Sequence, residues 1–83
     1  MELQELEAQL EAILFTMGDA VEVDRLATAL EHDVDTVRRV LRNMMDRYDA
    51  EDRGIQIIEL DGSFQMCTKS SMYESIIKIA HVP

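Results

Sequence analysis

The sequence predicts a single α+β domain, mostly α, in which three helices precede a β-hairpin and a last helix. Through roughly the first fifty positions, apolar residues recur at three- and four-residue steps, as on one face of an α-helix. The pattern then changes to two β-prone runs, Ile55–Leu60 and Ser63–Thr68, joined by Asp61-Gly62. Asp-Gly between two such runs is a strong hairpin signal. The 83 residues, 47% of them apolar, suffice for one core, so residues 1–83 are expected to form one domain.

The first helix is expected to begin near Leu3 and to end at Met17. Acidic residues crowd its first turn, where the helix dipole favours negative charge, and Gly18 follows as a C-terminal stop. The next residues, Asp19–Val23, are too few for more than an extended connection or a minor strand. The apolar stripe of this helix consists of Leu3, Leu6, Leu10, Ile13, Leu14 and Met17.

Two further helices are expected in the middle of the chain. The shorter one turns Leu26, Ala27 and Leu30 inward. The longer one has the cleanest pattern in the chain and is expected to end at about Ala50, after a cap at Asp33 or Asp35. Its apolar face consists of Val37, Val40, Leu41, Met44, Met45 and Tyr48.

The end of the chain is expected to form a last helix. Ser71 and Glu74 have the spacing of a capping box, and Pro83 stands where the helix would have to end. The apolar stripe of this helix consists of Tyr73, Ile76, Ile77 and Ala80. Helix, helix, helix, hairpin, helix is the element order of a winged-helix domain with an added C-terminal helix. The two middle helices would be the helix-turn-helix pair, and the hairpin would be the wing.

Composition and charge restrict the function. Seventeen acidic residues against eight basic ones give a net charge of −9, which repels a phosphate backbone unless the basic residues cluster. Cys67 is the single cysteine, so an internal disulfide is excluded. No apolar run is long enough to span a membrane, and the stretch Met1–Glu5 lacks the basic start of a signal peptide. We therefore expect a cytoplasmic protein without a membrane partner.

DNA binding is an obvious alternative, because the second helix of a helix-turn-helix pair enters the major groove. Here that helix carries Arg38, Arg39, Arg42 and Arg47. The competing interpretation is a solvated face with local ion pairs, since Asp35 lies four residues before Arg39 and Asp46 lies four after Arg42. The expected wing tip carries no cation. We expect no specific DNA binding by this domain alone, and a winged-helix transcription regulator stays the rival hypothesis.

Catalysis finds little support in the sequence. His32 and His81 lie far apart among loop-like residues, and nothing brings either one to Cys67. Cys67 alternates with apolar neighbours in an expected strand, so it is interpreted as a packing residue. The sequence also lacks a calcium-loop spacing and a glycine-rich phosphate loop. We expect a protein that is not an enzyme and holds neither a metal nor a cofactor.

A protein-contact surface is the further candidate. Ala8, Ala12 and Phe15 fall together on the side of the first helix away from its main stripe, and a helix apolar on two sides is buried twice. The competing interpretation is that these side chains reach the domain's own core. For Phe15, burial in the domain's own core and burial against a partner are equally good interpretations. For the alanines, burial in the domain's own core is the better one.

Several stretches of the chain resemble the segregation and condensation protein B family, and together they cover roughly Leu6 to Pro83. The opening helix and turn, the passage "tyrosine, acidic turn, arginine-glycine, strand" and the second wing strand of the family are all similar. Ala20 and Ser70 stand where the family often has proline, and both lie in expected turns. The matching stretches are Glu11–Phe15 with Gly18-Asp19, Asp46–Tyr48 with Arg53–Glu59, and Phe64–Lys69.

The resemblance implies a non-enzymatic, nucleoid-associated adaptor in chromosome condensation and segregation. Members of the family dimerise and bind the kleisin ScpA, which bridges the heads of the bacterial SMC ATPase. They have two winged-helix domains in tandem, of which the first dimerises and the second makes much of the kleisin contact, and this chain would be the first. A two-fold interface uses the same patch on both copies. We expect that patch on the first helix and the wing, with Leu3, Leu6, Phe15, Phe64 and Met66.

Overall fold

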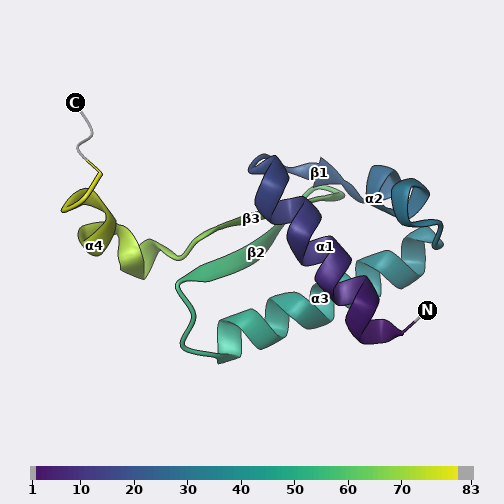
Figure 1. The fold of residues 1–83 in the computed structure, drawn as a ribbon, viewed down its shortest axis with the longest axis horizontal. Coiled ribbons are helices and arrows are strands. Elements are labelled where there is room, and N and C mark those ends of the chain that lie inside the picture. The colour runs from purple at the N-terminus through teal and green to yellow at the C-terminus, as the bar shows by residue number, and fades with distance from the viewer. Residues whose placement is uncertain (1, 81–83) are drawn as a thin grey trace.

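The computed structural model describes residues 2–80 and has the element order of the predicted winged helix (Figure 1). Helices α1, α2 and α3 and a small sheet form the body of the domain, and the segment from Ser70 to Ala80 stands away from it. The helices are α1 (Leu3–Met17), α2 (Val23–Leu30), α3 (Val34–Ala50) and α4 (Tyr73–Ile77). The strands are β1 (Val21–Glu22), β2 (Ile55–Leu60) and β3 (Ser63–Thr68), and a 3₁₀ turn (Ser70–Met72) precedes α4.

The sheet is antiparallel with the order β1-β3-β2, so the wing hairpin gains the short connecting strand as a third member. Ile55 pairs with Thr68, and Leu60 pairs with Ser63 next to the turn. Asp61 and Gly62 in that turn both have positive φ, 48° and 86°, as a two-residue hairpin loop that follows the strand twist requires. The predicted Asp-Gly hairpin is therefore confirmed.

Two helix ends follow local rules of capping. Gly18 adopts φ 74° after α1, and its N–H donates to the carbonyl of Leu14 at 3.2 Å. Asp33, and not Asp35, caps α3: its carboxylate accepts from the backbone N–H of Thr36 at 2.9 Å and from the Thr36 hydroxyl at 2.7 Å. These hydrogen bonds lower the pKa of the Asp33 carboxyl.

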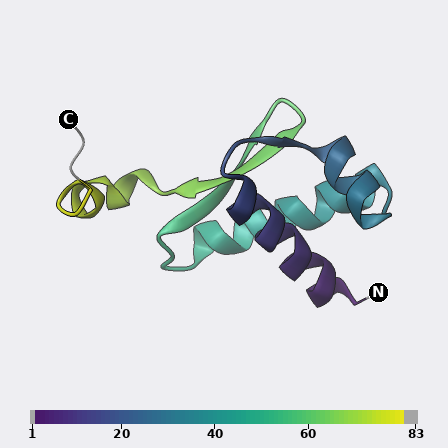
Figure 2. The same ribbon diagram turned by 45° about the horizontal axis from the view of Figure 1, so that its top comes forward.

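The core lies between α1, α3 and the inner face of the sheet, and α2 closes one end (Figure 2). All the fully buried residues among 2–80 are apolar or aromatic, and none is charged. The expected stripes of the first three helices supply most of them. Within those stripes, Ile13, Leu30 and Met45 are only half-buried, and Leu3 and Met17 are exposed. The sheet adds Ile57, Phe64 and Met66. Leu6, with an exposed fraction of 3%, belongs to the same core.

The C-terminal helix differs from its prediction. It has five residues, from Tyr73 to Ile77, and Met72 stands at its N-cap without a side-chain hydrogen bond. The expected capping box fails because Ser71 is already inside the 3₁₀ turn, which the N–H of Met72 closes on the carbonyl of Lys69 at 2.9 Å. Every residue from Ser70 to Ala80 is exposed. His81 and Pro83 lie outside the described residues.

Candidate protein-interaction surfaces

The arginines of α3 are mostly held by carboxylates. Arg42 makes a bidentate contact with Glu59 of the wing, with Nε 3.0 Å and Nη2 2.9 Å from the two carboxylate oxygens. Arg38 pairs with Asp35 at 2.9 Å, and Arg47 pairs with Glu7 of α1 at 3.2 Å. These ion pairs differ from the pairs Asp35–Arg39 and Arg42–Asp46, which the four-residue spacing in the sequence had suggested. In the part of the chain that the structure describes, Arg39 is the one arginine of this helix outside an ion pair.

This pairing removes most of the positive charge that a phosphate backbone would need. The hydrogen bonds from Arg42 lower the pKa of Glu59, so the wing carboxylate stays ionised and keeps the guanidinium occupied. The wing tip between residues 59 and 64 adds Asp61 and no basic residue. The face of α3 that would contact DNA therefore has the shape of a helix-turn-helix domain but lacks the unpaired positive charge that DNA binding needs. The transcription-regulator hypothesis finds no support here.

A polar network joins α1 to the end of α3 around Tyr48. The Tyr48 hydroxyl donates to the carboxylate of Glu11, and the guanidinium of Arg53 lies 4.5 Å from the centre of the Tyr48 ring. Burial, and then the hydrogen bond with Glu11, raises the pKa of Tyr48 to about 12. Tyr48 and Arg53, which belong to the passage that resembles the family, thus meet in one network. Sequence reasoning missed Glu11, because a partner 37 positions away leaves no local signal.

The outer face of α1 is open to solvent. Phe15 is 77% exposed, and Ala8 and Ala12 on the same side are exposed as well, so the interpretation that these side chains reach the domain's own core is wrong. Leu3 at the other end of the helix is 58% exposed. A shallow apolar hollow of about 270 Å³ lies along Ala12, Ile13, Thr16 and Met17. This face is free to receive a partner.

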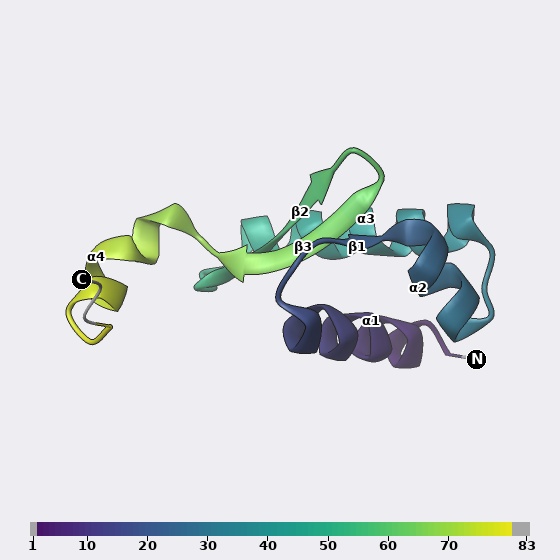
Figure 3. The same ribbon diagram turned by 90° about the horizontal axis from the view of Figure 1, so that it is seen from above.

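A second apolar surface lies on the C-terminal segment Ser70–Ala80, which we call the C-terminal arm. The arm extends from the end of β3 away from the helices, as Figure 1 and the perpendicular view in Figure 3 both show. It carries five exposed large apolar side chains: Met72, Tyr73, Ile76, Ile77 and Ile79. Sequence reasoning found the stripe on this segment and wrongly gave it to a longer, capped helix.

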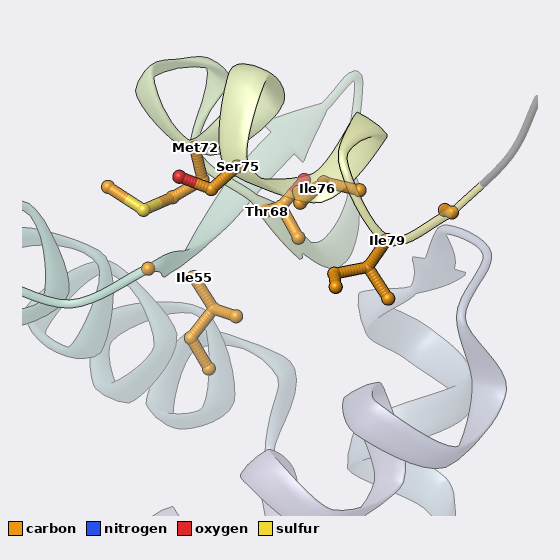
Figure 4. A pocket seen from close by; sticks show the side chains of 8 residues that line it. Ile55, Thr68, Met72, Ser75, Ile76 and Ile79 are labelled. Atoms are coloured by element: carbon orange, nitrogen blue, oxygen red, sulfur yellow. The ribbon is translucent and has the colours of Figure 1, made fainter.

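The arm and the base of the wing enclose an open groove of about 520 Å³ (Figure 4). Gly54 directly precedes β2, Ile55 and Thr68 come from the paired ends of β2 and β3, and the remaining wall comes from the arm. The lining is almost entirely apolar. It consists of Gly54, Ile55, Thr68, Met72, Ser75, Ile76, Ile79 and Ala80.

The structure separates the residues predicted for a dimer interface into two groups. Leu3 and Phe15 are exposed on α1 and stay candidates. Leu6, Phe64 and Met66 have exposed fractions of 3%, 0% and 8%, so they pack inside their own domain and present almost no area to a second one. Phe64 and Met66 point inward because alternate residues of β3 face the helices, and Leu6 points inward on the buried stripe of α1.

Metal and membrane sites are not evident in residues 2–80. No group of three or more histidine, cysteine, aspartate or glutamate side chains among them could hold a metal ion. Cys67 is a half-buried free thiol on β3. Within the same residues, no helix has the length and apolar character needed to cross a bilayer.

Comparisons with known proteins agree with the geometry. The family described as segregation and condensation complex subunit ScpB matches residues 8–83. Segregation and condensation protein B of Lachnoclostridium phytofermentans is 70% identical over 83 residues, which are all of this chain and 44% of that protein. The protein of the same name from Agathobacter rectalis is 46% identical over 77 residues, 92% of this chain and 41% of its own. The chain thus spans less than half the length of these relatives.

Solved structures show the same fold. A dimer of the ScpB N-terminal domain complexed with a ScpA peptide superposes with a TM-score of 0.87 at 30% identity, covering 94% of this chain and 98% of that one. ScpB from Mycobacterium tuberculosis superposes with a TM-score of 0.90 at 29% identity, covering 95% of this chain and 49% of that one.

Proposed function

The chain belongs to the segregation and condensation complex subunit ScpB family, and from this premise we propose that it is a non-enzymatic adaptor of a bacterial SMC–kleisin complex. In this role it pairs with a second copy of itself and binds the kleisin ScpA. The kleisin connects it to the SMC ATPase during chromosome condensation and segregation. The adaptor works in the cytoplasm, at the nucleoid.

One observation carries this proposal: the match to a dimeric N-terminal domain that holds a ScpA peptide. The match covers 98% of that relative's chain, so the present chain corresponds to a domain that, in the relative, holds a second copy and a ScpA peptide, and this supports the proposal. The match also supports the assignment of residues 1–83 as the first of two winged-helix domains. The full-length relatives are about twice as long, which leaves room for the second domain.

The surface chemistry supports protein partners over DNA. The recognition helix has most of its arginines engaged by carboxylates, and the chain as a whole carries −9. Two apolar surfaces, on α1 and on the C-terminal arm, are exposed instead. An adaptor with two partners can use two such surfaces, and a winged helix whose recognition-helix arginines are mostly paired can offer its scaffold to protein partners.

The test measures the solution mass and the peptide affinity of the same chain. Light scattering over a concentration series should give twice the 9.5 kDa of one copy. A labelled ScpA peptide from Lachnoclostridium phytofermentans, matched to the segment bound by the relative, should bind saturably in fluorescence anisotropy. A scrambled peptide of the same composition is the control. Failure of both measurements contradicts the proposal.

A DNA duplex in the same assay tests the rival hypothesis. We expect no binding at physiological salt. Salt-sensitive binding that weakens in Arg38→Ala and Arg39→Ala variants would favour a transcription regulator instead.

A further inference from the structure

We propose that the C-terminal arm is the element through which the domain pairs with a second copy, each arm laying its apolar face against the groove of the other. This inference rests on the proposed function, from which it takes the homodimer. It assigns the contact to a surface that the sequence did not suggest.

The arm has no cover within its own chain. Each of its residues is exposed, and Ile79, at 83%, is the most exposed of its large side chains. Five large apolar side chains on eleven consecutive residues form a continuous patch of the kind that soluble domains reserve for contacts. The Met72 side chain, at the start of the arm, lies next to Gly54.

The arm is nevertheless held in a defined direction at its root. The Lys69 N–H donates to the carbonyl of Gly54 at 2.9 Å, and its ammonium donates to the carbonyls of Tyr48 at 2.8 Å and Glu51 at 3.1 Å. Those two carbonyls lie at the C-terminal end of α3, where the helix dipole favours a cation. A projecting segment fixed in this way is preorganised for binding, which lowers the entropy lost on association.

The groove and the arm are suited to each other. Figure 4 shows Ile55 on the body side of the groove, and Ile76 and Ile79 on the arm side. The groove is open and apolar, and the arm offers side chains of the same kind on its exposed face. A two-fold arrangement therefore gives both copies the same contact, arm against groove and groove against arm, and closes after two copies.

Charge indicates that the second copy docks here and not along α1. The arm is formally neutral, because Lys78 balances Glu74, so the whole −9 of the chain lies on the body. Helix α1 has three glutamates and no basic residue. Glu7 and Glu11 contact Arg47 and Tyr48 of α3, but a two-fold contact along α1 would still bring two helices without a cation against each other. Two strongly acidic copies meet with the least repulsion where their surface is neutral and apolar.

The experiment compares matched single substitutions by light scattering over a concentration series. Ile79→Asp and Ile76→Asp lie on the arm, and Phe15→Asp and Leu60→Asp place the same charge on α1 and on the wing tip. We expect each arm variant to raise the dimer dissociation constant at least about a hundredfold, since every dimer contains the substituted site twice. The two control variants should remain dimers. Thermal unfolding should show that all four fold.

The possible outcomes separate this inference from the proposed function. A dimeric parent with monomeric, folded arm variants supports the arm. A dimeric parent whose arm variants stay dimeric while Phe15→Asp separates would overturn the arm and place the contact on α1. Arm variants that stay dimeric but lose ScpA peptide binding would overturn it too, because the groove would then belong to the kleisin. A parent that is monomeric at every concentration contradicts the proposed homodimer itself.

Discussion

Replacing Phe64 by alanine tests whether this side chain is a core residue or an interface residue. Phe64 is fully buried in the central strand β3, where it pairs with Val21 on one side and Glu59 on the other. Truncation of a buried phenylalanine to alanine costs about 3–5 kcal/mol, because a cavity is left behind. A domain of this length has about 4–12 kcal/mol of stability in total, so the variant should lose a large part of it.

The assay is urea and thermal unfolding at one fixed protein concentration, followed by circular dichroism. Phe64→Ala should lower the melting temperature by at least about 12 °C, at about 4–8 °C per kcal/mol. Phe15→Ala makes the same chemical change at a site that is 77% exposed, so its unfolding free energy should stay within about 0.5 kcal/mol of the parent. An unchanged midpoint for Phe64→Ala together with loss of the dimer would refute the assignment of Phe64 to the core.

Three further predictions concern local devices of the fold. Gly62→Ala should lower the free energy of unfolding by about 1–2 kcal/mol, because Gly62 has φ 86° in the wing turn. Gly54→Ala is the control, since a methyl group there meets Met72 at ordinary contact distance. Equal urea midpoints for the two variants would contradict the prediction. Asp33→Ala should lower the free energy of unfolding through loss of the α3 cap. Because the pKa of Asp33 is lowered in the folded state, its contribution is present above the unfolded value near 3.8 and lost as pH falls, so an acid titration should show a smaller fall in stability for the variant than for the parent. The pKa of Tyr48 is raised from 10.0 to about 12, so its contribution is complete below pH 10 and lost as pH rises toward 12; Tyr48→Phe should show less alkaline destabilisation than the parent, and identical alkaline curves would exclude the proposed hydrogen bond.

The elements of the body could be predicted because each is specified by local rules. Gly18 ends α1, Asp33 begins α3 and Asp61-Gly62 turns the wing, and each of these signals depends on neighbours within a few residues. Hydrophobic period alone placed the long helix within a residue of its end at Ala50.

What covers each apolar face could not be predicted in the same way. Period shows that Phe64 and Met66 share a face, but only packing shows that this face meets the helices of the same chain. The same limit explains the C-terminal arm, whose local pattern indicated a capped helix although no part of the body packs along it. Arg42 and Glu59 are 17 positions apart and belong to different elements, so spacing rules within one helix could not predict their pairing.

Lys69 gives the arm a mechanical property as well as a direction. Three hydrogen bonds attach Lys69, the residue before the arm, to Gly54 and to the end of α3, so a force applied to the arm would act on the end of α3. Because α3 is the longest helix and runs along the body, such a force would act on the domain as a whole through this helix. The direction in which anything attached to the arm leaves the domain therefore depends on the hydrogen bonds of Lys69, from its ammonium to two carbonyls and from its N–H to Gly54.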